Sequence, residues 1–183
     1  MQMVDRVHQI IAEYVKEGDQ VVDATLGNGW DTLKLCQLVG PTGKVIGFDI
    51  QEEAIENSKK RIEEAGFSER VELHCCSHEH VNSYVMNPIK AFMMNLGYLP
   101  GGEKSIVTCK DSTIKAISAL TELLSSGGVG TILVYYGHEG GPEEKHAVET
   151  FMANMPSNWG QITRMEIVNR KNTPPILYIL EKK

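Results

Sequence analysis

The stretch Val21-Val-Asp-Ala-Thr-Leu-Gly-Asn-Gly-Trp-Asp-Thr32 predicts a strand, a glycine turn and the start of a helix. Its first residues are β-branched and apolar, as a buried parallel strand requires, and Gly27 and Gly29 allow a tight turn at the helix N-terminus. A second apolar run ends on Asp49, about 20 positions further on, where a carboxylate can accept both hydroxyls of a ribose. Together the two segments predict a site for a nucleotide cofactor.

Two residues of this stretch separate the cofactor classes. A dinucleotide fingerprint has a third glycine where this chain has Thr32, and the acidic Asp23 closes the strand. A carboxylate beside the turn repels a diphosphate but attracts the ammonium and sulfonium groups of S-adenosylmethionine. The pattern therefore favours S-adenosylmethionine and disfavours a dehydrogenase. A glycine pair alone is also typical of an ordinary strand end, and it is the combination with Asp23 and Asp49 that favours a cofactor site.

The bulk composition suits one compact domain over residues 1–183, because 42% of the chain is hydrophobic and no linker-like segment interrupts it. The N-terminus has no signal-peptide pattern and no apolar run approaches the roughly 18 residues of a membrane span, so we expect a cytoplasmic, soluble protein. The net charge of −6 means that any RNA binding must use local basic patches. Lys104, Lys110 and Arg170 are the candidates near the expected site.

The hydrophobic periodicity predicts alternating strands and helices after an amphipathic helix that ends before Gly18. Such alternation is typical of a parallel sheet with helices on both faces, and the short link between the last two strands predicts an antiparallel hairpin. Gly127-Gly128 is expected to cap a helix, and Thr108 with Asp111 resembles a capping box. The expected strands are 20–25, 44–49, 70–75, 89–95, 129–136, 161–168 and 175–181, and the later helices 30–39, 52–65, 78–84, 111–124 and 143–154.

Candidate functional residues follow the strand ends, because ligands of open α/β sheets bind outside the carboxyl ends of the strands. Asn95 ends one strand and, with the Leu96 carbonyl, is expected to orient a substrate nitrogen. Tyr98 and His138 would border the acceptor base, although loops of this kind are often ordinary turns and a lone loop histidine is often a surface residue. His78, after the third strand, is expected to pack on adenine. The histidines near it show no zinc spacing, so no metal site is expected.

Four strings together resemble the YtqB/MnmM-type class I methyltransferases, also described as rRNA methylases. They are Asp-Ala-Thr-Leu-Gly-Asn-Gly from Asp23, Ser-His-Glu from Ser77, Asn-Leu-Gly-Tyr-Leu-Pro-Gly-Gly from Asn95, and Tyr-Tyr-Gly-His-Glu-Gly-Gly from Tyr135. The resemblance covers nearly the whole chain. The chain departs from the family pattern at Trp30, where histidine is expected, and at Cys76, where aspartate is expected.

The resemblance implies a Rossmann-like α/β fold with a seven-stranded, mostly parallel sheet whose last strand is antiparallel. It also implies an S-adenosylmethionine-dependent enzyme that methylates the 5-aminomethyl group of the modified wobble uridine, position 34 of tRNA. An rRNA acceptor, a small-molecule or protein amine, and a non-catalytic cofactor-binding subunit are the alternatives. The expected partner is the anticodon stem-loop of tRNA, with a homodimer as a further possibility.

The expected site residues fall into three groups. The catalytic group is Asn95, Tyr98 and His138, and the substrate-binding group is Lys104, Lys110 and Arg170. The cofactor-binding group is Asp23, Thr25, Gly27, Asn28, Gly29, Asp31, Thr32, Asp49, Ile50, Gln51, Ser77, His78, Asn95 and Leu96.

Overall fold

A computed structural model of the protein describes residues 2–99, 101–102 and 105–183. The strands are β1 Gln20–Asp23, β2 Lys44–Asp49, β3 Val71–Cys75, β4 Ile89–Leu96, β5 Leu124–Val134, β6 Gly160–Met165 and β7 Ile176–Lys182. The α-helices are α1 Met3–Tyr14, α2 Trp30–Val39, α3 Glu52–Glu64, α4 Lys110–Leu123 and α5 Gly141–Ala153. Two short 3₁₀ helices, η1 Ser68–Arg70 and η2 His78–Ser83, flank β3.

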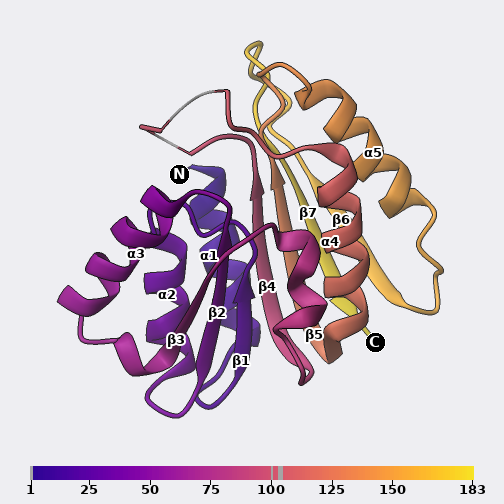
Figure 1. Ribbon diagram of the computed structural model, residues 1–183. Coiled ribbons are helices and arrows are strands. Elements are labelled where there is room, and N and C mark those ends of the chain that lie inside the picture. Colours follow the sequence, from indigo (N-terminus) through magenta and orange to yellow (C-terminus); the bar gives the residue numbers. More distant parts are fainter. Residues whose placement is uncertain (1, 100, 103–104) are drawn as a thin grey trace.

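The seven strands form one sheet in the order β3-β2-β1-β4-β5-β7-β6 (Figure 1). The neighbours from β3 to β5 pair in parallel, whereas β7 is antiparallel to both β5 and β6. The predicted seven-stranded sheet with a reversed last strand is therefore confirmed. Strand order changes direction between β1 and β4, so the switch point where ligands bind in such sheets lies at the carboxyl ends of these two strands.

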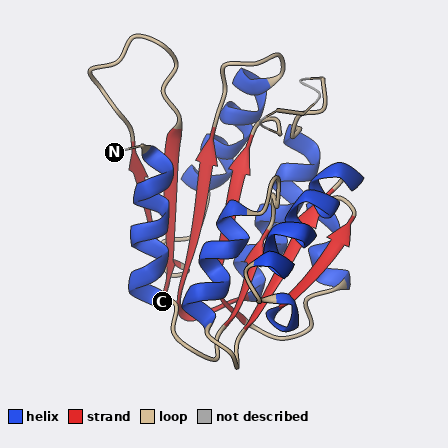
Figure 2. Ribbon diagram, turned by 90° about the vertical axis from the view of Figure 1, so that its left-hand side faces the viewer, coloured by secondary structure: helices blue, strands red, loops and turns tan. Residues whose placement is uncertain are grey.

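Helices cover both faces of the sheet, as Figure 2 shows in a second view. On one face, α1 and α2 bury apolar side chains against β1, β2, β4 and β5. The buried residues Met3, Val7 and Ile11 recur every four positions, which places the apolar stripe of α1 on the sheet. No helix within the described part of the chain is long and apolar enough to cross a membrane.

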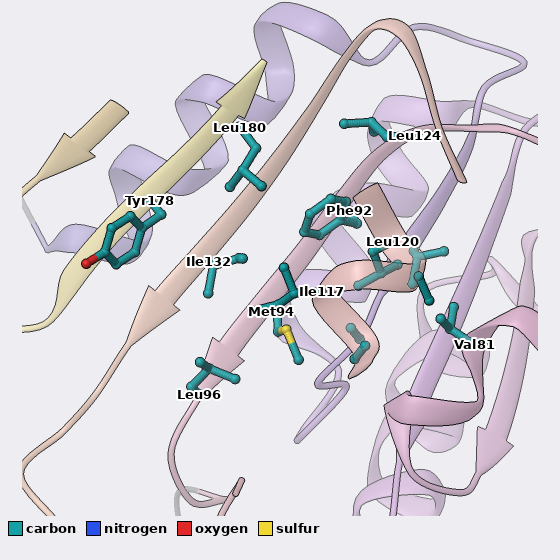
Figure 3. Packing of buried hydrophobic residues seen from close by; sticks show 14 of the residues in the cluster. Val81, Phe92, Met94, Leu96, Ile117, Leu120, Leu124, Ile132, Tyr178 and Leu180 are labelled. Carbon is teal, nitrogen blue, oxygen red and sulfur yellow. The ribbon is translucent and has the colours of Figure 1, made fainter. Parts of the chain in front are cut away.

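The opposite face carries the larger hydrophobic cluster, built from β4, β5 and β7 with η2, α4 and α5 (Figure 3). Phe92 lies at its centre, fully buried. Gly130 on the neighbouring strand lets this ring lie against the backbone, because a Cβ there would come within 2.2 Å of the ring. The close packing fixes β4 and β5 relative to each other, and these are the strands that carry the acceptor side of the site.

The junction between α4 and β5 differs from the sequence expectation. The helix ends at Leu123, and the buried Leu124 already begins the strand, five residues before the expected start at 129. Gly127, with φ of +69°, therefore lies inside β5 near a register shift opposite Ile89 and Ala91, and the prediction that Gly127-Gly128 caps the helix is wrong. Glycine with a positive φ occurs both at helix C-termini and in β-bulges, so the sequence pattern does not distinguish the two.

Candidate active site

Acidic and amide side chains meet at the switch point of the sheet. Asp23 ends β1, Asp49 ends β2, and Asn95 is the penultimate residue of β4. These strands are adjacent and parallel, so their carboxyl ends lie at one edge. The structure thus brings together the strand-end residues that the sequence selects.

The glycine turn is held by hydrogen bonds from both sides. The Asp49 carboxylate accepts the backbone N–H of Gly27 at 2.9 Å and that of Gln51 at 3.0 Å. From α3, the Ser58 hydroxyl donates to the Gly27 carbonyl at 2.9 Å. Gly29 has φ of +76°, and a Cβ there would lie 2.6 Å from the Ser58 oxygen, so α3 packs too closely for any larger residue. Each oxygen of Asp49 still has a free acceptor direction for a hydroxyl.

Asp23 is fully buried behind this turn. Its carboxylate accepts the Thr32 hydroxyl at 2.6 Å and the Thr25 backbone N–H at 3.2 Å. Burial, followed by the negative charges of Asp31 and Asp49, raises the pKa of Asp23 to about 7. A bound cation opposes each of these effects, so the site suits the positively charged end of S-adenosylmethionine.

The adenine side of the expected cofactor site lies after β2 and β3. His78 places Nδ1 3.2 Å from the Ala24 carbonyl, so this nitrogen carries the proton and Nε2 is an acceptor, buried and without a hydrogen-bond partner among the described residues. Burial lowers the pKa of His78 and keeps the ring neutral. Ile50 is 56% exposed beside Asp49 and offers an apolar surface. The Ser77 hydroxyl caps η2 by accepting the Glu79 N–H.

Asn95 is fixed at both backbone and side chain. Its N–H donates to the Thr25 hydroxyl at 2.7 Å, and its side-chain Nδ2 donates to Asp31 Oδ2 at 2.5 Å. The other oxygen of Asp31 lies 2.5 Å from His8 Nε2. Asn95 Oδ1 is buried and has no hydrogen-bond partner in the described structure, so this acceptor is left unused within the protein.

Aromatic side chains lie beside the switch point. Tyr98 and His138 lie edge to face, with ring centroids 6.4 Å apart, so the two loops predicted to border the acceptor do meet. Burial and the charge of Asp31 raise the pKa of Tyr135, which keeps its hydroxyl protonated near the carboxylate. The Leu96 carbonyl, expected to orient the substrate, accepts the Tyr135 N–H at 3.0 Å within the sheet and has only one acceptor direction left.

A buried glutamate anchors the loop that follows Asn95. Glu144, at the start of α5, accepts the hydroxyls of Thr108 at 2.8 Å and Thr113 at 2.6 Å. Thr108 in turn accepts the N–H of Gly97 at 2.9 Å. The predicted capping box is wrong, because the N-cap of α4 is Cys109 without a side-chain bond and Thr108 serves the loop instead.

The expected RNA-binding residues lie at the same edge of the sheet where the structure describes them. Lys110 is exposed at the first position of α4, and Arg170 is exposed in the loop between β6 and β7. That loop packs against the Tyr135 segment, since a Cβ on Gly137 would lie 3.1 Å from the Thr173 hydroxyl. Lys104 lies outside the described residues.

The sequence reasoning missed four residues of this arrangement. Ser58 and Arg61 of α3 hold the glycine turn, the latter through a bond from Nε to the Asn28 carbonyl at 2.8 Å. Glu144 anchors the loop after β4, and His8 reaches Asp31 from α1. His8 was detectable, because it lies four positions after Val4 and three before Ile11, on the apolar stripe of its helix.

Sheet order, the reversed last strand and the glycine turn together define a class I S-adenosylmethionine-dependent methyltransferase. A family model described as "Putative rRNA methylase" matches residues 45–181, and one described as "Protein-L-isoaspartate(D-aspartate) O-methyltransferase (PCMT)" matches residues 1–80. The chain belongs to the rRNA methylase family.

Individual relatives agree with this assignment. The "tRNA (mnm(5)s(2)U34)-methyltransferase, chloroplastic" of Arabidopsis thaliana is 35% identical over 185 residues, 96% of this chain and 68% of the relative. The structure of a "putative rRNA-methylase" from Clostridium thermocellum is 43% identical with a TM-score of 0.98, covering 100% of this chain and 98% of that one. SMU.1697c, a "putative methyltransferase" from Streptococcus mutans solved with SAH, is 34% identical with a TM-score of 0.92, covering 100% and 99%. S-adenosylmethionine is therefore the cofactor, as predicted.

Proposed function

We propose that this enzyme transfers a methyl group to the primary amine of the 5-aminomethyl group on the wobble uridine, position 34 of tRNA. The observation that carries the proposal is the buried, unpartnered Oδ1 of Asn95 at the switch point. An amide oxygen there accepts an N–H from an amine and leaves the nitrogen lone pair free for attack. The name of the Arabidopsis relative supports the choice of this amine as the acceptor.

The cofactor fits the residues that surround the switch point. We assign the ribose hydroxyls to Asp49, the cationic end to Asp23, and the adenine ring to Ile50 and His78. The acceptor His78 Nε2 matches the exocyclic amine of adenine, a role that the thiol of Cys76 fills poorly. The bound cofactor supplies an electrophilic methyl group on a sulfonium.

The protein's part in the transfer is to position a neutral amine. An alkylamine in water is mostly protonated, and partial desolvation beside the rings of Tyr98 and His138 lowers its pKa by disfavouring the charged form. Asn95 then holds the amine in line with the methyl group, which removes much of the orientational cost of the reaction. No strong general base is needed once the amine is neutral, because the secondary ammonium formed by the transfer can lose its extra proton to water.

We further propose that Lys110 and Arg170 contact phosphates of the anticodon stem-loop, because both are exposed at the sheet edge that carries the switch point. Lys104 is assigned the same role from the sequence alone. Two copies of the chain would enlarge this surface for a large RNA, and we expect a homodimer by sedimentation analysis. The proposed setting is the cytoplasm, with residues 1–183 acting as one catalytic domain.

Methyl incorporation tests the proposed function directly. Labelled S-adenosylmethionine is incubated with the enzyme and with total tRNA and rRNA from a strain that lacks the gene, followed by nucleoside mass analysis. We expect label in tRNA, on a uridine whose aminomethyl arm gains one methyl group. Label confined to rRNA would replace the proposed acceptor by the family's other one. No label in either RNA, with cofactor binding intact, would favour a small-molecule or protein amine.

A further inference from the structure

Three side chains from distant parts of the sequence form a chain of hydrogen bonds at the switch point. His8 comes from α1, Asp31 from the first turn of α2, and Asn95 from the end of β4. His8 Nε2 lies 2.5 Å from one oxygen of Asp31, and the other oxygen accepts Asn95 Nδ2 at 2.5 Å. The side chains of His8 and Asp31 are only 25% and 13% exposed, so solvent screens these contacts weakly.

Asp31 determines which end of the Asn95 amide is left without a partner. A carboxylate accepts hydrogen bonds only, so it binds the NH₂ end of the amide and excludes the oxygen end. The backbone N–H bond from Asn95 to the Thr25 hydroxyl keeps the whole residue in place. Asn95 Oδ1 is therefore turned away from Asp31 and left as the buried acceptor. Without the carboxylate, the amide is free to flip and present a donor to the substrate amine.

The charge of Asp31 also strengthens the acceptor. A hydrogen bond from an amide N–H to a carboxylate is charge-assisted and polarises the amide, which increases the negative charge on its oxygen. The substrate nitrogen gains positive charge as the new N–C bond forms, so an acceptor on its N–H is bound more tightly in the transition state than in the ground state. Interactions of this kind raise kcat more than they lower KM.

His8 completes the arrangement from the opposite side of the carboxylate. His8 Nε2 donates to Asp31 Oδ1 and thereby fixes the rotation of the Asp31 side chain, so that Asp31 Oδ2 stays aligned with Asn95 Nδ2. On this basis we propose that His8 and Asp31 are positioning residues that set the direction and the acceptor strength of the Asn95 amide toward the substrate amine. The proposal rests on the proposed function in taking an amine as the nucleophile.

Steady-state kinetics of His8 and Asp31 variants test the proposal, because loss of a positioning residue should lower kcat more than it changes KM. Asp31→Asn should lower kcat about 100-fold, with cofactor affinity within threefold of the wild type, because asparagine keeps the shape but presents no charge. His8→Phe should lower kcat at least 10-fold, whereas His8→Gln, whose amide N–H can reach Asp31, should recover most of that loss. The matched control is His146→Phe on the exposed surface of α5, which should leave kcat within twofold. Equal kcat in the wild type and Asp31→Asn would overturn the proposal, as would equal losses in His8→Gln and His8→Phe.

A second measurement does not depend on the acceptor. In ¹⁵N-labelled protein, the side-chain NH₂ of Asn95 should give a slowly exchanging, downfield-shifted pair of resonances in the wild type, and this signature should be lost in Asp31→Asn. An Asn95 NH₂ that exchanges rapidly in the wild type would refute the fixed amide. Failure of the wild type to methylate tRNA, with the signature present, would instead refute the proposed function and leave the positioning intact. Thermal unfolding of each variant establishes that the fold is retained.

Discussion

Replacing Asp23 with asparagine tests whether the charge of this buried carboxyl binds the cationic end of the cofactor. Burial and the charges of Asp31 and Asp49 raise the pKa of Asp23 from its ordinary 3.8 to about 7. With binding restricted to the ionised form, the competent fraction rises from roughly a tenth at pH 6 to roughly three quarters at pH 7.5. Cofactor affinity should therefore increase about eightfold across this range. The range ends there because α-amino groups, including that of the cofactor, titrate near 8.

Isothermal titration calorimetry at several pH values, in two buffers of different ionisation enthalpy, measures both the affinity and the proton released on binding. The wild type should release a fraction of a proton that declines as the pH rises through 7, and Asp23→Asn should bind more weakly with no such release. Thr32→Val is the matched control: its hydroxyl lowers the pKa of Asp23, so its loss should move the midpoint to higher pH. Wild-type affinity that is constant between pH 6 and 7.5 would refute the reasoning.

The Asp23→Asn variant should also change how the free energy of unfolding depends on pH. Between about pH 4 and pH 7 the folded chain keeps a proton on Asp23 that the unfolded chain has released, so the free energy of unfolding falls as the pH rises through this window. The raised pKa corresponds to a loss of about 4 kcal/mol by pH 8. Asp23→Asn lacks this loss and should gain stability relative to the wild type between pH 5 and pH 8 in urea titrations. Parallel pH profiles for the two proteins would contradict the assignment.

Four further substitutions probe the scaffold. Glu144→Ala leaves the buried Thr113 hydroxyl and the half-buried Thr108 hydroxyl without their acceptor and should lower the free energy of unfolding by roughly 2 to 4 kcal/mol, measured by urea denaturation. Gly29→Ala combines a positive φ with a contact to Ser58, whereas Gly66→Ala has the same φ and open space. The first should therefore cost at least about 1 kcal/mol more than the second and alone should weaken cofactor binding in a fluorescence titration. Phe92→Ala empties the core beside Gly130 and should cost about 3 to 5 kcal/mol by chemical denaturation, with an unchanged slope on denaturant concentration.

Much of the fold was predictable because local pattern and global arrangement agree in this chain. The β-branched run before Gly27 forms a buried parallel strand. The link before Ile176 is short, so β7 returns antiparallel to β6 as the reversed last strand. The start of β5 was not predictable in the same way. Gly127 serves a helix cap or a bulge with the same backbone angles, and only its pairing opposite β4 decides between them.

The site shows the same division between local and tertiary information. The strand-end rule places Asp23, Asp49 and Asn95 correctly at one edge, since it depends only on where strands stop. The partner of Asn95 depends on how α1 and α2 pack, so the contact of His8 with Asp31 is beyond any local pattern. The Leu96 carbonyl, expected to orient the substrate, also accepts the Tyr135 N–H, a bond that follows from the pairing of Leu96 with Val134 and that no local pattern predicts.

The position of α1 bears on the order in which the chain folds. This helix packs on β5, far along the chain, and the Tyr14 hydroxyl donates to Glu181 in the last strand. The apolar stripe beside His8 is therefore covered only after β5 has joined the sheet. Contacts between such distant segments form slowly, so His8 reaches Asp31 only in a late step of folding.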